Sequence, residues 1–171
     1  GGYTTGYEGW EPTPIKYTHI STEHNLDLYA AFQRLYLITD NPAWQERAGH
    51  ALRFVQAMWD DVEKKFWTGT VADGVTIFKE VVPVDVQAWA LMALKDHQQP
   101  YLKTLDYAEA QLMVGQGFDF NQDTDGVWFE GTAQMAAAYS KVGRSDRQKQ
   151  LVDSIKTAQH PSGGVFATDR E

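Results

Sequence analysis

Three stretches of the chain repeat one pattern, in which two amphipathic helices are separated by a short polar turn and followed by an aromatic, glycine-containing segment. Apolar side chains recur every three or four residues, the spacing of a helix that buries one face. Such a pair buries its apolar stripe only against neighbouring pairs, so the chain is constrained to an array of helical hairpins. The units are predicted at 21–81, 82–129 and 130–171, after a loop at 1–20 from a preceding unit. We predict one all-α domain over 1–171.

Local signals place the helix boundaries. Asp40-Asn41-Pro42 interrupts the first helical pattern, and Pro83 opens the second unit at a position where proline costs no helical hydrogen bond. The predicted helices span 23–38, 44–59, 82–94, 101–112, 130–139 and 147–159.

Short strands are predicted after each second helix. The segments 66–70, 117–120 and 163–166 alternate aromatic or apolar residues with small ones. Asp73-Gly74 and Asp125-Gly126 are typical hairpin turns. We therefore expect small β-hairpins at one end of the helical array.

Composition excludes several classes of function. Fifteen Lys and Arg against 23 Asp and Glu give a net charge of −8, which repels a nucleic-acid backbone. The chain has no cysteine, and no apolar run approaches the ~20 residues of a membrane span. Serine-hydrolase, P-loop and dinucleotide motifs are absent from the sequence. A secreted or periplasmic location is favoured, although the composition suits cytosol equally.

Three acidic residues take corresponding places in the three units. Asp27 and Asp85 are 58 residues apart, and Asp85 and Glu130 are 45 residues apart, as the units are. If the first helices line the inside of a ring or arc, their N-terminal ends face one mouth, so these carboxylates are expected to line a common cleft. Glycosidic bond cleavage needs one proton-donating carboxyl and one ionised carboxylate.

Helix capping is the alternative role for these acids, because carboxylates near a helix N-terminus stabilise the helix without any chemistry. This alternative stays open for all three residues. Asp27 lies inside the apolar pattern and shares a helical face with Glu23 and His24, which a simple cap would not require.

Aromatic residues are expected at the same end as the acids, where their faces would suit the apolar faces of sugar rings. They are Tyr7, Trp10, Trp67, Trp89 and Trp128. A core position is the alternative for Trp89, which lies among Ala, Leu and Met, and also for the tryptophans of the loops.

A metal site has one weak candidate. Asp119, Asn121, Asp123 and Asp125 form an oxygen-rich loop of the kind that binds calcium, but the glycine of this loop is misplaced for that motif. No helix carries a facing histidine pair for zinc. Chemistry without a cofactor is the default expectation.

The segments Glu23-His24-Asn25-Leu26-Asp27, Pro83-Val84-Asp85-Val86-Gln87 and Trp128-Phe129-Glu130-Gly131-Thr132 resemble the six-hairpin (α/α)-toroid glycosidases and their relatives. This architecture also carries polysaccharide lyases and sugar epimerases. The resemblance implies a carbohydrate-active protein whose inner-helix acids carry the reaction. About three of six hairpins are present, so it implies part of a toroid, and self-association is expected if the ring is incomplete.

The leading hypothesis is hydrolysis of an oligo- or polysaccharide, with Asp85 or Glu130 as acid and Asp27 as base or substrate ligand. The expected substrate-binding residues are Glu23, His24, Gln134 and the five aromatic residues above. The alternatives are a non-catalytic helical module that binds glycan or protein, an epimerase, and a lyase with Tyr7 or His24 as base. Few basic residues lie at the cleft end, which favours hydrolysis over lyase chemistry.

Overall fold

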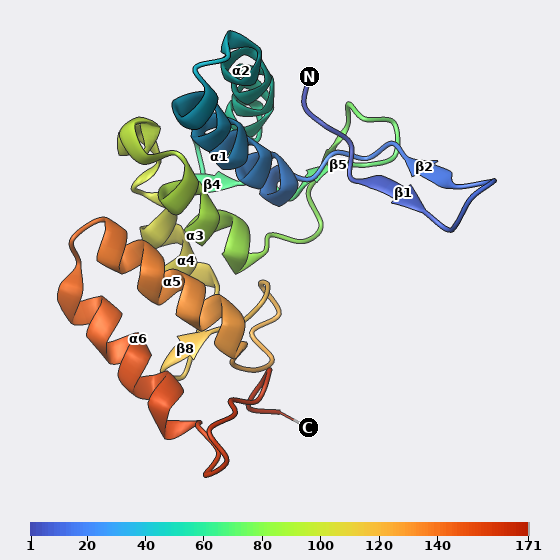
Figure 1. The fold of residues 1–171 in the computed structure, drawn as a ribbon. Helices are drawn as coiled ribbons and strands as arrows, with labels where there is room; N and C mark the ends of the chain where they lie inside the picture. Colours follow the sequence, from blue (N-terminus) through green and yellow to red (C-terminus); the bar gives the residue numbers. More distant parts are fainter. Residues whose placement is uncertain (171) are drawn as a thin grey trace. The chain divides into compact units, whose positions relative to one another are not determined.

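The computed structural model describes residues 1–170, except for the side chain of Asp96. Within these residues the chain forms six α-helices joined by loops and short strand pairs (Figure 1). The helices are α1 (Thr22–Thr39), α2 (Pro42–Ala57), α3 (Val84–Ala93), α4 (Thr104–Gln111), α5 (Phe129–Lys141) and α6 (Ser145–Thr157), with 3₁₀ turns η1 (Lys95–His97) and η2 (Gln99–Tyr101). The predicted all-α class, with repeated helical hairpins and short strand pairs, is confirmed.

The chain divides into two compact units. Unit 1 contains Gly1–Asp61 and Phe66–Val81, and unit 2 contains Val62–Lys65 and the chain from Val82 onward. The chain crosses between the units at 61–62 and 65–66, near β3 (Trp59–Asp60) and β4 (Lys65–Phe66), and again at 81–82. No helix in the described part of the chain combines the length and the apolarity needed to cross a membrane.

Unit 1 is built around the α1–α2 hairpin, whose helices pack against each other. Ser21 caps α1 by accepting a hydrogen bond from the His24 N–H at 3.3 Å, and Asn41 caps α2 by accepting one from Ala43 at 3.0 Å. Asp40 ends α1 in a left-handed conformation (φ 50°). The interruption of the helical pattern therefore contains the C-cap of α1 (Asp40), the N-cap of α2 (Asn41) and the first residue of α2 (Pro42).

Two strand pairs complete unit 1. Strands β1 (Gly6–Glu8) and β2 (Ile15–Tyr17) form a hairpin that extends away from α1 and α2 (Figure 1). Strands β5 (Gly69–Thr70) and β6 (Ile77–Phe78) pair through the predicted Asp73-Gly74 turn. A Cβ at residue 69 would lie 2.0 Å from the Ile20 carbonyl oxygen, so this close approach requires glycine.

Unit 2 is built on α3, which packs against α4 and α5, while α5 packs against α6. Apolar residues occupy all sides of α3, and most of them are buried, as expected of a helix with neighbours on several faces. The buried Gln87 amide donates to the Pro83 carbonyl at 3.1 Å and accepts a hydrogen bond from the Thr104 hydroxyl at 2.6 Å. The Gln87 side chain thus links α3 to the start of α4 by a hydrogen bond.

The strand pair that follows α4 differs from the prediction. Strands β7 (Met113–Val114) and β8 (Gly117–Phe118) turn at 115–116, not at Asp125-Gly126. The reason is a hydrogen bond within the segment: the Asp119 carboxylate accepts from the Asp125 N–H at 2.7 Å and shapes the segment as a loop. The 163–166 segment contributes a single bridge, between Gln159 and Val165, and no full strand pair.

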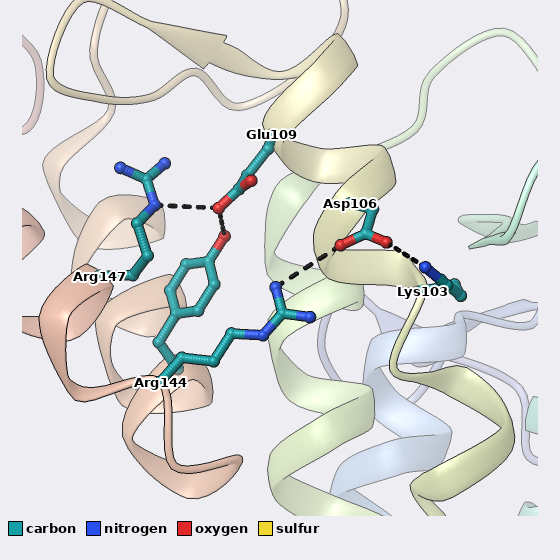
Figure 2. A network of polar contacts seen from close by, with 6 residues as sticks. Lys103, Asp106, Glu109, Arg144 and Arg147 are labelled. Carbon is teal, nitrogen blue, oxygen red and sulfur yellow. Dashed lines mark hydrogen bonds and ion pairs between the residues drawn. The ribbon is translucent and has the colours of Figure 1, made fainter.

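A polar network joins α4 to α5 and α6 (Figure 2). Glu109 accepts hydrogen bonds from the Tyr139 hydroxyl at 2.6 Å and from Arg147 Nε at 2.9 Å. Burial and the Glu109 carboxylate raise the pKa of Tyr139, so the phenol remains a hydrogen-bond donor. Nearer the surface, Asp106 pairs with Lys103 at 2.8 Å and with Arg144 at 3.5 Å.

The two acids of this network should differ in their contribution to stability. Glu109→Gln weakens two charge-assisted hydrogen bonds, one of them to a fully buried tyrosine, and should lower the free energy of unfolding by about 1–2 kcal/mol. The isosteric control Asp106→Asn breaks exposed pairs and should cost less than ~1 kcal/mol. Urea unfolding at pH 7 measures both, and equal losses would contradict the assignment.

The contribution of Asp106 should depend on pH. The hydrogen bond from Lys103 and the nearby charges lower the pKa of Asp106. Its stabilisation is therefore present above the pKa of ~3.9 of an unfolded aspartate and is lost as the pH falls through the folded-state pKa. The difference in unfolding free energy between wild type and Asp106→Asn should therefore shrink as the pH falls from the usual aspartate pKa through the lower folded-state pKa. Urea unfolding at pH 7, 5 and 3 provides the test, and a difference that grows on acidification would contradict the prediction.

Candidate functional site

The first turns of α3 and α5 meet in unit 2. A Cβ on Gly131, the third residue of α5, would lie 2.6 Å from Val84 Cγ1 and 2.3 Å from the Trp128 ring. Only glycine allows this approach, because real Cβ atoms do not come so close to other atoms. The two helices thus begin at the same end of unit 2 (Figure 1).

Neighbouring loops complete the hydrogen bonding of these helix starts. The Val84 N–H donates to the Phe120 carbonyl at 2.9 Å, and the Phe129 N–H donates to the Ala167 carbonyl at 2.9 Å. Donors that a helix leaves unsatisfied at its N-terminus are therefore paired with the 117–128 loop and with the C-terminal segment. Both segments are held against the end of unit 2 where α3 and α5 begin.

Two of the expected catalytic acids lie on these first turns. Asp85 and Glu130 are each the second residue of their helix, so neither is the N-cap residue. Asp85 is only 8% exposed, and its Oδ1 accepts a hydrogen bond from the Val86 N–H at 2.6 Å. Glu130 is exposed and accepts a 3.4 Å hydrogen bond from Gln134. The positive end of the helix dipole stabilises both carboxylates, so helix stabilisation and chemistry are compatible roles.

An aromatic pair lies beside these turns. The rings of Phe120 and Trp128 are 5.3 Å apart in an edge-to-face arrangement, and Phe120 is 41% exposed. Trp128 was predicted as a sugar ligand and Phe120 was not, although Phe120 belongs to the alternating segment 117–120 and that pattern could have identified it. Trp89 is half-buried within α3, one turn after Asp85.

The structural counterpart of these acids in unit 1 is Glu23. It is the second residue of α1, as Asp85 and Glu130 are of their helices, whereas Asp27 lies one turn further along. Loss of hydration raises the pKa of Asp27, and the neighbouring His24 lowers it. The predicted helices 44–59 and 101–112 gave the spacing that aligned Asp27, but Tyr101 lies in the 3₁₀ turn η2 and α4 begins at Thr104. The expectation that all three predicted catalytic acids line one cleft stays a prediction.

The aromatic residues predicted in unit 1 differ in accessibility. Tyr7, on β1, is 65% exposed, and Trp10, between β1 and β2, is 91% exposed. Trp67 is 8% exposed, and the Lys79 ammonium lies 5.2 Å from its ring centroid. Tyr7 and Trp10 therefore present accessible rings, and Trp67 presents little of its ring.

The acidic loop is internally hydrogen-bonded. Carboxylate oxygens of Asp119, Asp123 and Asp125 lie within 4.8 Å of one another. Asp119, 5% exposed, accepts hydrogen bonds from Phe120 at 2.6 Å and from Asp125, and Asn121 accepts one from the Asp123 N–H at 2.9 Å. Burial raises the pKa of Asp119, while the hydrogen bond from Asn121 lowers that of Asp123. These bonds give the acids a role in shaping the loop, and calcium binding stays a prediction.

The environment of Asp27 can be tested directly. His24→Ala removes the group that lowers the Asp27 pKa, so the pKa should rise further above the usual value of ~3.9. Carboxyl-carbon NMR titration measures the change. His19→Ala, also in unit 1, should leave the Asp27 pKa unchanged, and a fall in the His24 variant would contradict the prediction.

Comparison with known proteins identifies similar structures. No protein-family model matches the sequence, and no curated protein sequence matches it significantly. Cellobiose 2-epimerase from Spirochaeta thermophila DSM 6192 matches 94% of the chain with a TM-score of 0.70 and 20% identity. The GH76 α-mannanase of Bacteroides thetaiotaomicron matches 95% with a TM-score of 0.66 and 11% identity. A family 88 glycosyl hydrolase from Bacteroides vulgatus matches 88% with a TM-score of 0.66 and 13% identity.

The chain spans about half the length of these structures, at 48%, 48% and 53% respectively. Identities this low establish likeness of fold. The predicted resemblance to (α/α)-toroid carbohydrate-active enzymes is confirmed at that level, and the chain has the fold of part of such a toroid.

Proposed function

We propose that the protein acts on carbohydrates and hydrolyses glycosidic bonds at the end of unit 2 where α3 and α5 begin. One observation carries the proposal: Gly131 lets the first turns of α3 and α5 pack together, and each turn bears a carboxylate at its second residue. The similar solved structures include glycoside hydrolases and an epimerase, which supports a sugar substrate.

Hydrolysis adds water across the glycosidic bond. One carboxylic acid gives a proton to the departing oxygen, and an ionised carboxylate either activates the water or attacks the anomeric carbon. We assign the acid to Asp85 or Glu130 and give Asp27 the role of base or substrate ligand. Asp85 is buried and Glu130 is exposed, and such different environments give two carboxyl groups different roles in catalysis.

Aromatic rings and polar side chains would hold the sugar. Phe120, which is 41% exposed beside Trp128, offers an accessible aromatic ring for the apolar face of a pyranose. Gln134 and, in unit 1, the exposed Tyr7 and Trp10 are further candidates. Glu23, His24, Trp67 and Trp89 remain proposed substrate ligands.

Two alternatives compete with hydrolysis. The epimerase is 20% identical to this chain, so exchange of configuration at one sugar carbon is the second candidate reaction. A helical module that binds glycan without turnover is the other alternative, because the exposed aromatic residues would serve binding equally well. Product mass separates these cases, since hydrolysis adds water and epimerisation leaves the mass unchanged.

The proposal predicts a specific pattern of activity. On a panel of neutral and acidic oligosaccharides, analysed by chromatography coupled to mass spectrometry, wild type should release shorter products. Asp85→Asn and Glu130→Gln should each lower kcat/KM at least ~100-fold because each removes a group that transfers protons or stabilises charge. Binding of substrate, measured by calorimetry, should change only a few-fold.

Asp146→Asn is the matched control. Asp146 is an exposed acid in the first turn of α6, the outer helix of the third hairpin, and its loss should leave turnover near wild type. Turnover unaffected in both Asp85→Asn and Glu130→Gln would exclude the assigned acids. Binding without any product would favour the binding module.

A further inference from the structure

A shallow hollow of about 270 Å³ lies in the segment that follows α6. The described residues that line it are His160, Ser162, Gly164, Val165 and Phe166. Phe166 is 64% exposed and Val165 is 42% exposed, so an aromatic ring and an aliphatic side chain face solvent there. Sequence analysis noted this segment as strand-like and assigned no function to it.

The hollow is formed by a closed turn. The His160 N–H donates to the Gly164 carbonyl at 2.8 Å, and the Gly163 N–H donates back to the His160 carbonyl at 2.8 Å. Gln159 Nε2 adds a hydrogen bond to the Gly163 carbonyl at 2.7 Å. These bonds hold the lining residues in place before any ligand arrives, which lowers the entropic cost of binding.

The lining combines apolar and hydrogen-bonding groups. The ring of Phe166 lies edge-to-face with the His160 imidazole, at 6.1 Å between centroids. His160 Nδ1 lies 2.8 Å from the Ser162 hydroxyl, and within residues 1–170 no protein group is hydrogen-bonded to Nε2. The hollow thus combines an exposed aromatic ring with a hydroxyl and an imidazole, which suits a pyranose with its apolar C–H faces and rim of hydroxyls.

The segment that lines the hollow continues to the start of α5. Phe166 is followed by Ala167, whose carbonyl accepts the Phe129 N–H at 2.9 Å, and Glu130 is the next residue after Phe129. Thr168 also forms a β-bridge with Trp128. The backbone that follows the hollow is therefore hydrogen-bonded next to one of the two carboxylates proposed for catalysis.

We propose that this hollow is a subsite for one neutral sugar ring of the substrate, stacked on Phe166 and hydrogen-bonded by His160 and Ser162. Its volume lies just below the ~300–1,000 Å³ of pockets for drug-sized ligands, which suits a single ring. None of the five lining residues is Asp, Glu, Lys or Arg, so the subsite selects a neutral sugar over a uronic acid. The inference rests on the proposed function and extends it to a ligand class.

Titration of the full chain with cellobiose, α-mannobiose and digalacturonate tests the subsite. The Val165 methyl signals report the location of binding by NMR, and calorimetry gives the dissociation constant. A neutral disaccharide should shift these signals. Phe166→Ala should raise its dissociation constant about tenfold, and should raise KM in turnover assays with little change in kcat, because the subsite binds the ground state and the transition state alike.

Three further variants separate loss of the ring from loss of the fold. Gly164→Leu places a side chain in the hollow, and its Cβ would meet nothing closer than Ser162 Oγ at 3.9 Å, so the variant should fold and lose binding. Phe166→Tyr keeps the aromatic face and should bind within about twofold of wild type. Leu37→Ala, which removes a 72% exposed apolar side chain from α1, should bind as wild type does.

Each remaining outcome is decisive. Wild-type binding or turnover that Phe166→Ala and Gly164→Leu leave unchanged would overturn the subsite while the proposed hydrolysis stands. Tighter, Phe166-dependent binding of digalacturonate would overturn the neutral-sugar assignment. A wild type that neither binds nor converts any sugar would overturn the proposed function and the subsite together.

Discussion

The close contact between the first turns of α3 and α5 is the constraint on which the organisation of unit 2 depends. Gly131 leaves room for Val84 and for the Trp128 ring, and any side chain at that position would push the helices apart. With the helix starts together, Asp85 and Glu130 occupy adjacent first turns. The candidate chemistry therefore depends on the absence of a single Cβ.

Backbone pairing extends this arrangement to the surrounding loops. Carbonyls of Phe120 and Ala167 accept the N–H groups of Val84 and Phe129, so two segments distant in sequence meet at one end of unit 2. The loops carry the accessible rings of Phe120 and Phe166, and the helices carry the acids. Rigid helix ends that present acids beside aromatic loops suit a substrate with hydroxyls and apolar faces, as sugars have. Elsewhere in unit 2, hydrogen bonds to Glu109 of α4 link this helix to α5 and α6.

Residue patterns predicted much of this organisation, and their failures have physical causes. Helical periodicity located all six helices within a few residues, since burial of one face imposes that period whatever the neighbours are. The Asp73-Gly74 turn formed as predicted, but Asp125-Gly126 did not, because the Asp119 carboxylate captures the Asp125 N–H. Spacing aligned Asp27 with Asp85, whereas the helix start aligns Glu23, because Tyr101 belongs to the 3₁₀ turn η2 and α4 begins only at Thr104.

By itself, the sequence determined the all-α class, the hairpin repeat and the approximate helix boundaries, and it supplied the candidate residues of the proposed site. These features depend on neighbours along the chain or on one periodic face, and local physics specifies both. Tertiary structure alone decided that Asp85 is buried while Glu130 is exposed, that the first turns of α3 and α5 meet, and that the loop at Phe120 and the segment at Ala167 lie against them. Such features arise from contacts between residues far apart in the chain, and no local pattern encodes those contacts.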